Sequence, residues 1–178
     1  MIISVEKAKS LISFPDFWKD EKIEMKLKAV EQTIRAYTNN NFQDRGCRIV
    51  ACIRAGVFMS DSLIPFEVDD TIQISESRYN KGLFTVAEET DDTTFMVKED
   101  TKNEDDVLIT KVVYPADVIA CCVDLMEWEV NNRGKVGIKS ETISRHSVTY
   151  FDQDASNQVM GYPAALLGCL KAYRKCRC

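Results

Sequence analysis

The sequence has 178 residues, of which 45% are hydrophobic and 29% charged, and this describes one folded domain rather than a disordered or multi-domain chain. Its 23 basic and 28 acidic residues give a net charge of −5, which argues against sequence-independent binding of DNA or anionic lipid. No apolar stretch has the length of a membrane span, and the charged N-terminal residues do not predict a signal peptide. Seven cysteines, an odd count without a Cys-x-x-Cys pair, indicate free thiols in a reducing cytosol.

Two helices are predicted before residue 41. Ser4 can cap a short helix that runs to about Ile12, and the step from Phe14 to Pro15 ends it, because the residue before proline avoids helical angles. A longer helix follows from Asp20 to the asparagine run at 39–41. Its apolar residues recur at spacings of four and three, which places them on one face: Ile23, Leu27, Val30, Ile34 and Tyr37.

Residues 46–114 change to short runs of β-branched and aromatic residues separated by Asp, Asn, Gly and Pro. Five short strands are predicted there, and such strands favour a small barrel or sandwich. The predicted strands cover residues 48–54, 71–75, 83–86, 94–98 and 107–113.

Two further helices and an arm are predicted after the strands. Pro115 suits the first position of a helix that ends near Asn131, and Pro163 begins a last helix. Between them, residues 142–151 form an extended stretch that could be a hairpin arm. The predicted class is therefore α+β: a small α-helical bundle of about four helices with an inserted small antiparallel β module and an extended arm. Residues 1–45 and 115–178 would form the helical core, and residues 46–114 the inserted module.

Motifs for catalysis or cofactor binding are scarce. His146 is the one histidine, and neither a Gly-x-Ser-x-Gly nucleophile nor a Gly-rich phosphate loop occurs. The cysteines lack the paired spacing of zinc ligands, and the acidic stretch 87–106 lacks the calcium-loop pattern. We therefore expect no enzyme activity, no cofactor and no metal, although a small enzyme using His146 stays an alternative.

Charge is placed unevenly along the chain. Residues 87–106 contain nine acidic residues, whereas the last eight residues contain Lys171, Arg174, Lys175 and Arg177 and no acid. Such a tail can pair with an acidic partner, and the arm can be captured by strand addition, so an interaction protein is the leading interpretation. A regulatory or nucleic-acid-binding adaptor that uses the basic C-terminal tail is the alternative.

The order of four local patterns adds a resemblance. The last and most specific pattern runs through Ser-Glu at 140–141, Ser-Val-Thr-Tyr at 147–150, Pro163 and Leu-Lys-Ala-Tyr-Arg at 170–174. The other three patterns are Ile-Arg-Ala-Tyr-Thr at 34–38 with Asn-Phe at 41–42, the segments 70–75 and 77–86, and Tyr-Pro at 114–115 with Trp-Glu at 128–129. In this order, and over most of the chain, they resemble the head-tail connector, or head-completion adaptor, family of tailed bacteriophages and prophages.

This resemblance implies a structural role in the virion at the head-tail junction, after assembly in the cytoplasm of the host bacterium. Subunits of the family form a homo-oligomeric ring, commonly dodecameric, that docks on the portal protein and extends the DNA channel towards a tail-side stopper protein. DNA would pass without specific binding, and no membrane is involved. The resemblance names the portal as the partner of the basic tail, so portal binding is expected at Lys171, Tyr173, Arg174, Lys175 and Arg177. The arm is expected to form a subunit interface at His146, Val148 and Tyr150, because alternating Val148 and Tyr150 would expose apolar side chains.

Overall fold

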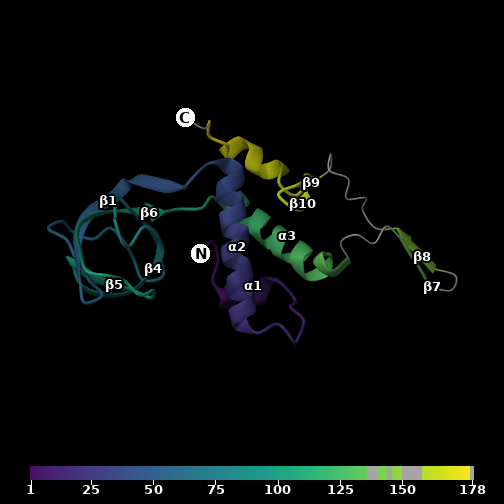
Figure 1. The fold of residues 1–178 in the computed structure, drawn as a ribbon, viewed down its shortest axis with the longest axis horizontal. Helices are drawn as coiled ribbons and strands as arrows, with labels where there is room; N and C mark the ends of the chain where they lie inside the picture. The colour runs from purple at the N-terminus through teal and green to yellow at the C-terminus, as the bar shows by residue number, and fades with distance from the viewer. Residues whose placement is uncertain (136–139, 144–145, 150–157, 177–178) are drawn as a thin grey trace. The chain divides into compact units, whose positions relative to one another are not determined.

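The computed structural model describes residues 1–135, 140–143, 146–149 and 158–176 (Figure 1). The chain separates into two compact units. The first consists of Asn41–Tyr114 together with Met1, and the second consists of Ile2–Asn40 and Pro115–Cys178. We describe each unit by itself.

The first unit is a closed antiparallel β-barrel, in which the strands follow the order β1-β2-β5-β4-β3-β6. The barrel closes because β1 and β6 pair over most of their length, with Ile49 opposite Ile109. Closure pairs every sheet edge, and this protects the strands from edge-to-edge aggregation. The strands are β1(Gln43–Arg54), β2(Val57–Met59), β3(Thr71–Ser75), β4(Gly82–Asp91), β5(Thr94–Val97) and β6(Glu104–Val112).

Alternation along the strands fills the barrel with apolar side chains. In β1, Ile49, Ala51 and Ile53 are buried, and the residues between them face outward. Phe58 and Phe95, both members of this buried cluster, stack with ring centroids 4.8 Å apart. This core forms from residues of all six strands, so the strands stabilise one another.

Strand β2 was not predicted from the sequence, because an alanine stands in the turn that precedes it. Ala55 and Gly56 connect β1 to β2 with φ angles of 50° and 83°, the left-handed pair that a two-residue hairpin needs. Alanine is not a signal for such a turn. Its backbone N–H donates to Asn103 Oδ1 at 2.8 Å, which stabilises the turn from the neighbouring loop.

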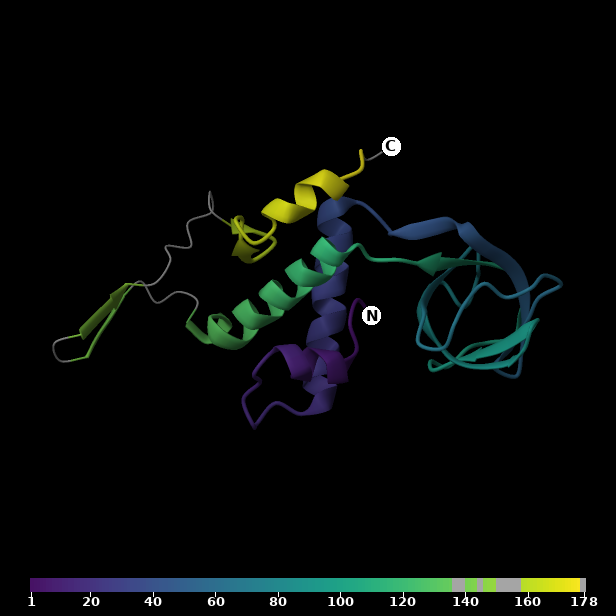
Figure 2. The same cartoon turned by 180° about the vertical axis from the view of Figure 1, so that it is seen from behind.

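The second unit packs helices around α2(Asp20–Thr38). Helix α3(Ala116–Asn131) crosses α2, and the C-terminal 3-10 helix η2(Gly168–Tyr173) lies against both, as the two views agree (Figures 1 and 2). The remaining elements are α1(Val5–Leu11), η1(Arg133–Lys135), β7(Ser140–Ile143), β8(His146–Thr149), β9(Gln158–Val159) and β10(Tyr162–Pro163). Strands β7 and β8 form one two-stranded ladder, and β9 and β10 form another.

The apolar face predicted for residues 20–38 is confirmed in α2. Ile23, Leu27, Val30 and Ile34 are all buried, Tyr37 is only half-buried, and Glu21 and Lys28 on the opposite face are exposed. The predicted helix near the N-terminus is also confirmed, because the Ser4 hydroxyl accepts from the Lys7 N–H at 3.2 Å and caps α1.

The predicted fold class is wrong. In place of a four-helix bundle with a small β module, the protein has a closed six-stranded barrel and short helices, of which three in the described residues are α-helices. The last predicted helix, expected to begin at Pro163, is instead the end of β10, a turn at residues 164–167 and the 3-10 helix η2. Just before this segment, Met160 and Gly161 form the turn between β9 and β10, with φ angles of 53° and 82°.

The buried face of α2 predicts the effect of a charge inside it. Leu27 is 2% exposed, so Leu27→Asp places an unpaired carboxylate in the helical core at a cost of several kcal/mol. We expect this variant to lose the cooperative thermal transition of the second unit in circular dichroism. Met25→Asp is the matched control, because Met25 lies on the same helix and is 60% exposed. An unaltered transition in Leu27→Asp would contradict the packing of α2.

Candidate functional site

The predicted portal-binding residues gather at the C-terminal end of the second unit. Lys171 and Tyr173 lie in η2, and Arg174 and Lys175 follow it directly. Three of these residues, Lys171, Arg174 and Lys175, are exposed. Arg177 lies outside the described residues. The structure therefore brings the described members of this predicted site together on one short segment.

The end of α2 holds this segment in place. The Lys175 N–H donates to the Thr38 carbonyl at 2.8 Å. Asn39, which ends the helix with a φ of 48°, donates from Nδ2 to the Cys176 carbonyl at 3.0 Å. The Asn40 amide donates to the Tyr173 carbonyl at 3.3 Å. The asparagines that end the helix thus also bind the backbone of the tail.

Two side chains of the segment are engaged by the helices. The Tyr173 hydroxyl donates to both carboxylate oxygens of Asp117 at 2.7 Å. This hydrogen bond, with some burial, raises the pKa of Tyr173. The Arg174 guanidinium lies 5.2 Å from the centre of the Tyr37 ring, within the range of a cation–π contact. Lys171 and Lys175 present the segment's exposed ammonium groups.

The predicted subunit-interface residues fall on the β7–β8 hairpin or next to it. His146 is paired with Ile143, and Val148 with Glu141. Tyr150 lies outside the described residues. Among those residues no third strand pairs with this ladder.

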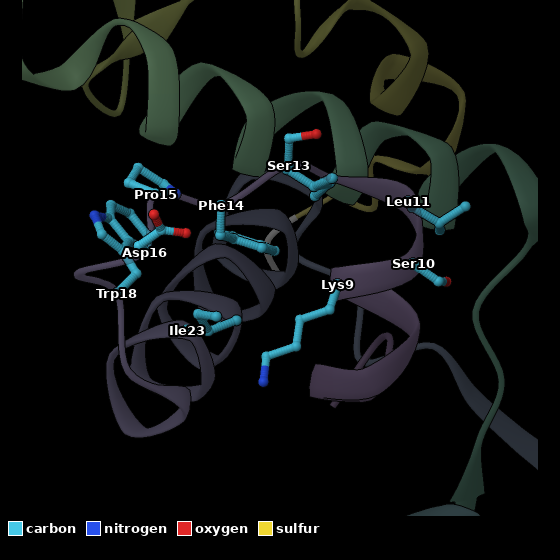
Figure 3. A pocket seen from close by; sticks show the side chains of 10 residues that line it. Lys9, Ser10, Leu11, Ser13, Phe14, Pro15, Asp16, Trp18 and Ile23 are labelled. Carbon is cyan, nitrogen blue, oxygen red and sulfur yellow. The ribbon is translucent and has the colours of Figure 1, made fainter.

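The loop between α1 and α2 surrounds a hollow of about 450 Å³ (Figure 3). Phe14, Trp18 and Ile23 supply apolar walls, and Lys9 and Asp16 supply charged ones. Helices α1 and α2 and this loop also expose large apolar side chains: Leu11 is 52% exposed, Phe17 74% and Met25 60%. The helical unit therefore has apolar surface that its own residues do not cover.

The outer wall of the barrel carries a second uncovered surface. Cys52 of β1 is opposite Met59 of β2, and Val57 of β2 is opposite Met96 of β5. Because alternate residues share a face of a strand, these pairs continue one another across the wall. We call the whole set the barrel stripe, and it consists of Leu108, Val50, Cys52, Met59, Val57 and Met96.

One loop of the barrel is fixed by a carboxylate that the sequence analysis missed. Glu104 accepts hydrogen bonds from the Ser77 hydroxyl at 2.6 Å, the Tyr79 N–H at 3.2 Å and the Asn80 amide at 2.8 Å. These bonds, the one from Ser77 foremost, lower the pKa of Glu104 to about 2. The loop is thereby held rigidly with Tyr79 at its exposed tip, 54% exposed.

A second missed carboxylate joins the parts of the helical unit. Glu129 of α3 has a side chain that is 2% exposed, and it accepts from Lys26 Nζ at 2.8 Å. It also accepts from Arg133 Nε at 2.9 Å and from the Tyr162 hydroxyl at 2.8 Å. Arg133 Nη1 reaches the Gly161 carbonyl at 3.1 Å. A sequence signal existed, because Glu129 lies three and four residues after Met126 and Leu125, on the buried face of α3.

Burial alone would raise the pKa of Glu129, because an apolar environment disfavours the charged carboxylate. The hydrogen bonds from Arg133, Lys26 and Tyr162 outweigh this effect and lower the pKa to about 2. Glu129 is therefore an ionised structural group with all its donors in place, not a proton donor for catalysis.

In the described part of the chain, no group of three or more His, Cys, Asp or Glu side chains could hold a metal ion. No helix there combines the length and the apolar character needed to cross a bilayer. Among the free cysteines, Cys121 and Cys122 are buried and Cys169 is exposed.

Comparisons with known proteins add no assignment. No protein-family model matches the chain, and no curated protein matches its sequence.

The Glu129 cluster predicts a pH-dependent stability. The folded-state pKa of about 2 is below the ordinary value of 4.5, so the contribution of Glu129 is complete above pH 4.5 and is lost as the pH falls towards 2. We expect Glu129→Gln to lower the free energy of unfolding by about 2 kcal/mol at pH 7, because the half-buried Lys26 and Arg133 lose their counter-charge. The difference from wild type should shrink in the acid range when denaturant unfolding is measured against pH. Glu127→Gln, at an exposed position of α3, should leave stability unchanged. A constant difference at all pH values would count against the role of the carboxylate charge.

Proposed function

We propose that this protein is a structural head-tail connector of a tailed phage or prophage. The observation that carries the proposal is the β7–β8 hairpin, a two-stranded ladder that lies in the segment with the most specific part of the resemblance. Isolated two-stranded hairpins are marginally stable in water, and a neighbouring subunit can complete them. A chain that inserts such an element between α3 and its C-terminal segment is suited to assembly with copies of itself.

Uncovered apolar surface supports the same role. Both units have it: the barrel stripe on the first, and Leu11, Phe17 and Met25 on the second. Subunits of a ring have two lateral neighbours and a partner at each end, so several separate surfaces are needed. An enzyme with one substrate has no such requirement, and we propose a structural rather than a catalytic protein.

The charge distribution fits a DNA conduit. A net charge of −5 disfavours retention of DNA phosphates, so DNA can pass without being bound. In this proposal the basic C-terminal segment with Lys171, Arg174 and Lys175 docks on the portal protein, and a stopper protein binds on the tail side. The ring, which would be dodecameric as in the family, assembles in the bacterial cytoplasm and remains in the virion.

The proposed subunit interface can be tested by replacing two of the residues predicted to form it. We expect Val148→Lys with Tyr150→Lys to abolish ring formation on the portal. Two ammonium groups would replace apolar side chains at the proposed contact with a neighbouring subunit. Ring formation is measured by electron microscopy and light scattering of the purified mixture. Ser147→Lys with Thr149→Lys adds the same charge at the alternate positions and is the matched control. Normal rings from the first variant would contradict the interface.

The tail can be tested by charge reversal that leaves its backbone hydrogen bonds intact. We expect Lys171→Glu with Lys175→Glu to weaken binding to the portal at least tenfold at low salt, with a smaller loss at high salt, because ionic contacts are screened. Lys7→Glu with Lys19→Glu changes two other exposed lysines of the same unit and controls for net charge. Salt-dependent retardation of DNA by wild type, with no affinity for the portal, would instead support the nucleic-acid-binding alternative.

A further inference from the structure

Two cysteines from different elements of the second unit meet at one backbone oxygen. Cys121 Sγ of α3 lies 3.4 Å from the Leu166 carbonyl oxygen, and Cys169 Sγ of η2 lies 3.7 Å from the same oxygen. The two thiols are therefore neighbours in space, although they are far apart in the sequence. Both are free thiols in this structure.

The two thiols differ in their access to solvent. Cys121 is buried at 1% exposure, and burial first, followed by the hydrogen bond and charge of Cys169, raises its pKa. Cys169 is exposed. An oxidant in solution therefore meets Cys169, whereas Cys121 is placed to react with Cys169 and is shielded from other reagents. This is the arrangement of an attacking and a resolving cysteine.

We propose that Cys121 and Cys169 form a reversible disulfide when the protein meets a small-molecule disulfide such as oxidised glutathione. The Cys169 thiolate attacks one sulfur of the glutathione disulfide, whose S–S bond breaks and releases one glutathione thiolate. Cys121 then loses its proton and attacks the Cys169 sulfur, which expels the second glutathione thiolate. Two protein thiols are oxidised to one disulfide, one glutathione disulfide is reduced to two thiols, and the two protons end on glutathione.

This cross-link would tie the C-terminal segment to α3. It would close the chain between Cys121 and Cys169 into a loop that contains the β7–β8 hairpin, and it would fix η2, which carries Lys171. A protein made in a reducing cytosol would stay in the thiol form and acquire the cross-link on release into an oxidising environment. The proposal does not depend on the connector function.

The test is to incubate the folded, full-length protein with oxidised glutathione, block the remaining thiols and map the peptides by mass spectrometry. We expect a peptide pair joined through Cys121 and Cys169, with the loss of two hydrogens, that reduction separates. The thermal midpoint should rise by roughly 5 °C or more on oxidation and return on reduction.

Two variants make the result specific. Cys176→Ser with Cys178→Ser removes the other cysteines near the C-terminus and should keep the cross-link and the thermal shift. Cys169→Ser, at an exposed position that tolerates the change, should lose both while its circular dichroism matches wild type. A glutathione adduct that persists on Cys169, a bond to a different cysteine, or unreacted Cys121 and Cys169 in oxidised protein would each overturn the proposal.

Discussion

The helical unit depends on one buried carboxylate. Glu129 accepts hydrogen bonds from Lys26 of α2, from Arg133 just after α3 and from Tyr162 of β10, so a single ionised group joins three segments. Loss of one of these hydrogen-bond donors would leave the buried carboxylate partly unpaired, which costs folding free energy. The cluster therefore favours the arrangement in which all three segments are in place. Arg133 extends the cluster to the Gly161 carbonyl and so fixes the tight turn that leads into the C-terminal segment. The segments on either side of the hairpin are held through this cluster.

The residues at the end of α2 also have two roles. Asn39 ends the helix in a left-handed conformation, and its side chain, with that of Asn40, binds carbonyl groups of the tail. Lys175 completes the contact through its backbone N–H, which leaves its side chain outside this network of bonds. An ordered backbone with exposed lysines loses less conformational entropy on binding than a frayed helix end would. The same residues therefore serve the fold and the proposed docking on the portal.

The barrel and the β7–β8 hairpin differ in how fully their strands are paired. The barrel pairs all its strand edges and fills its interior with apolar side chains, so its stability does not require a partner. The β7–β8 hairpin is the contrasting case among the described residues, because its two strands form a separate ladder. This contrast supports assigning assembly to the hairpin, while the barrel stripe offers apolar surface on an already stable support.

The sequence by itself determined the local elements with a strong period. The four-and-three spacing of Ile23, Leu27, Val30 and Ile34 predicted α2, and β-branched runs predicted five of the barrel strands, because these signals depend on neighbouring residues alone. Only the tertiary structure decided the rest. Closure of the barrel depends on pairing β1 with β6, and the Glu129 cluster and the meeting of Cys121 with Cys169 join residues that are distant in the chain. No local pattern specifies such contacts, since their free energy arises only when packing removes water from groups that the sequence keeps apart.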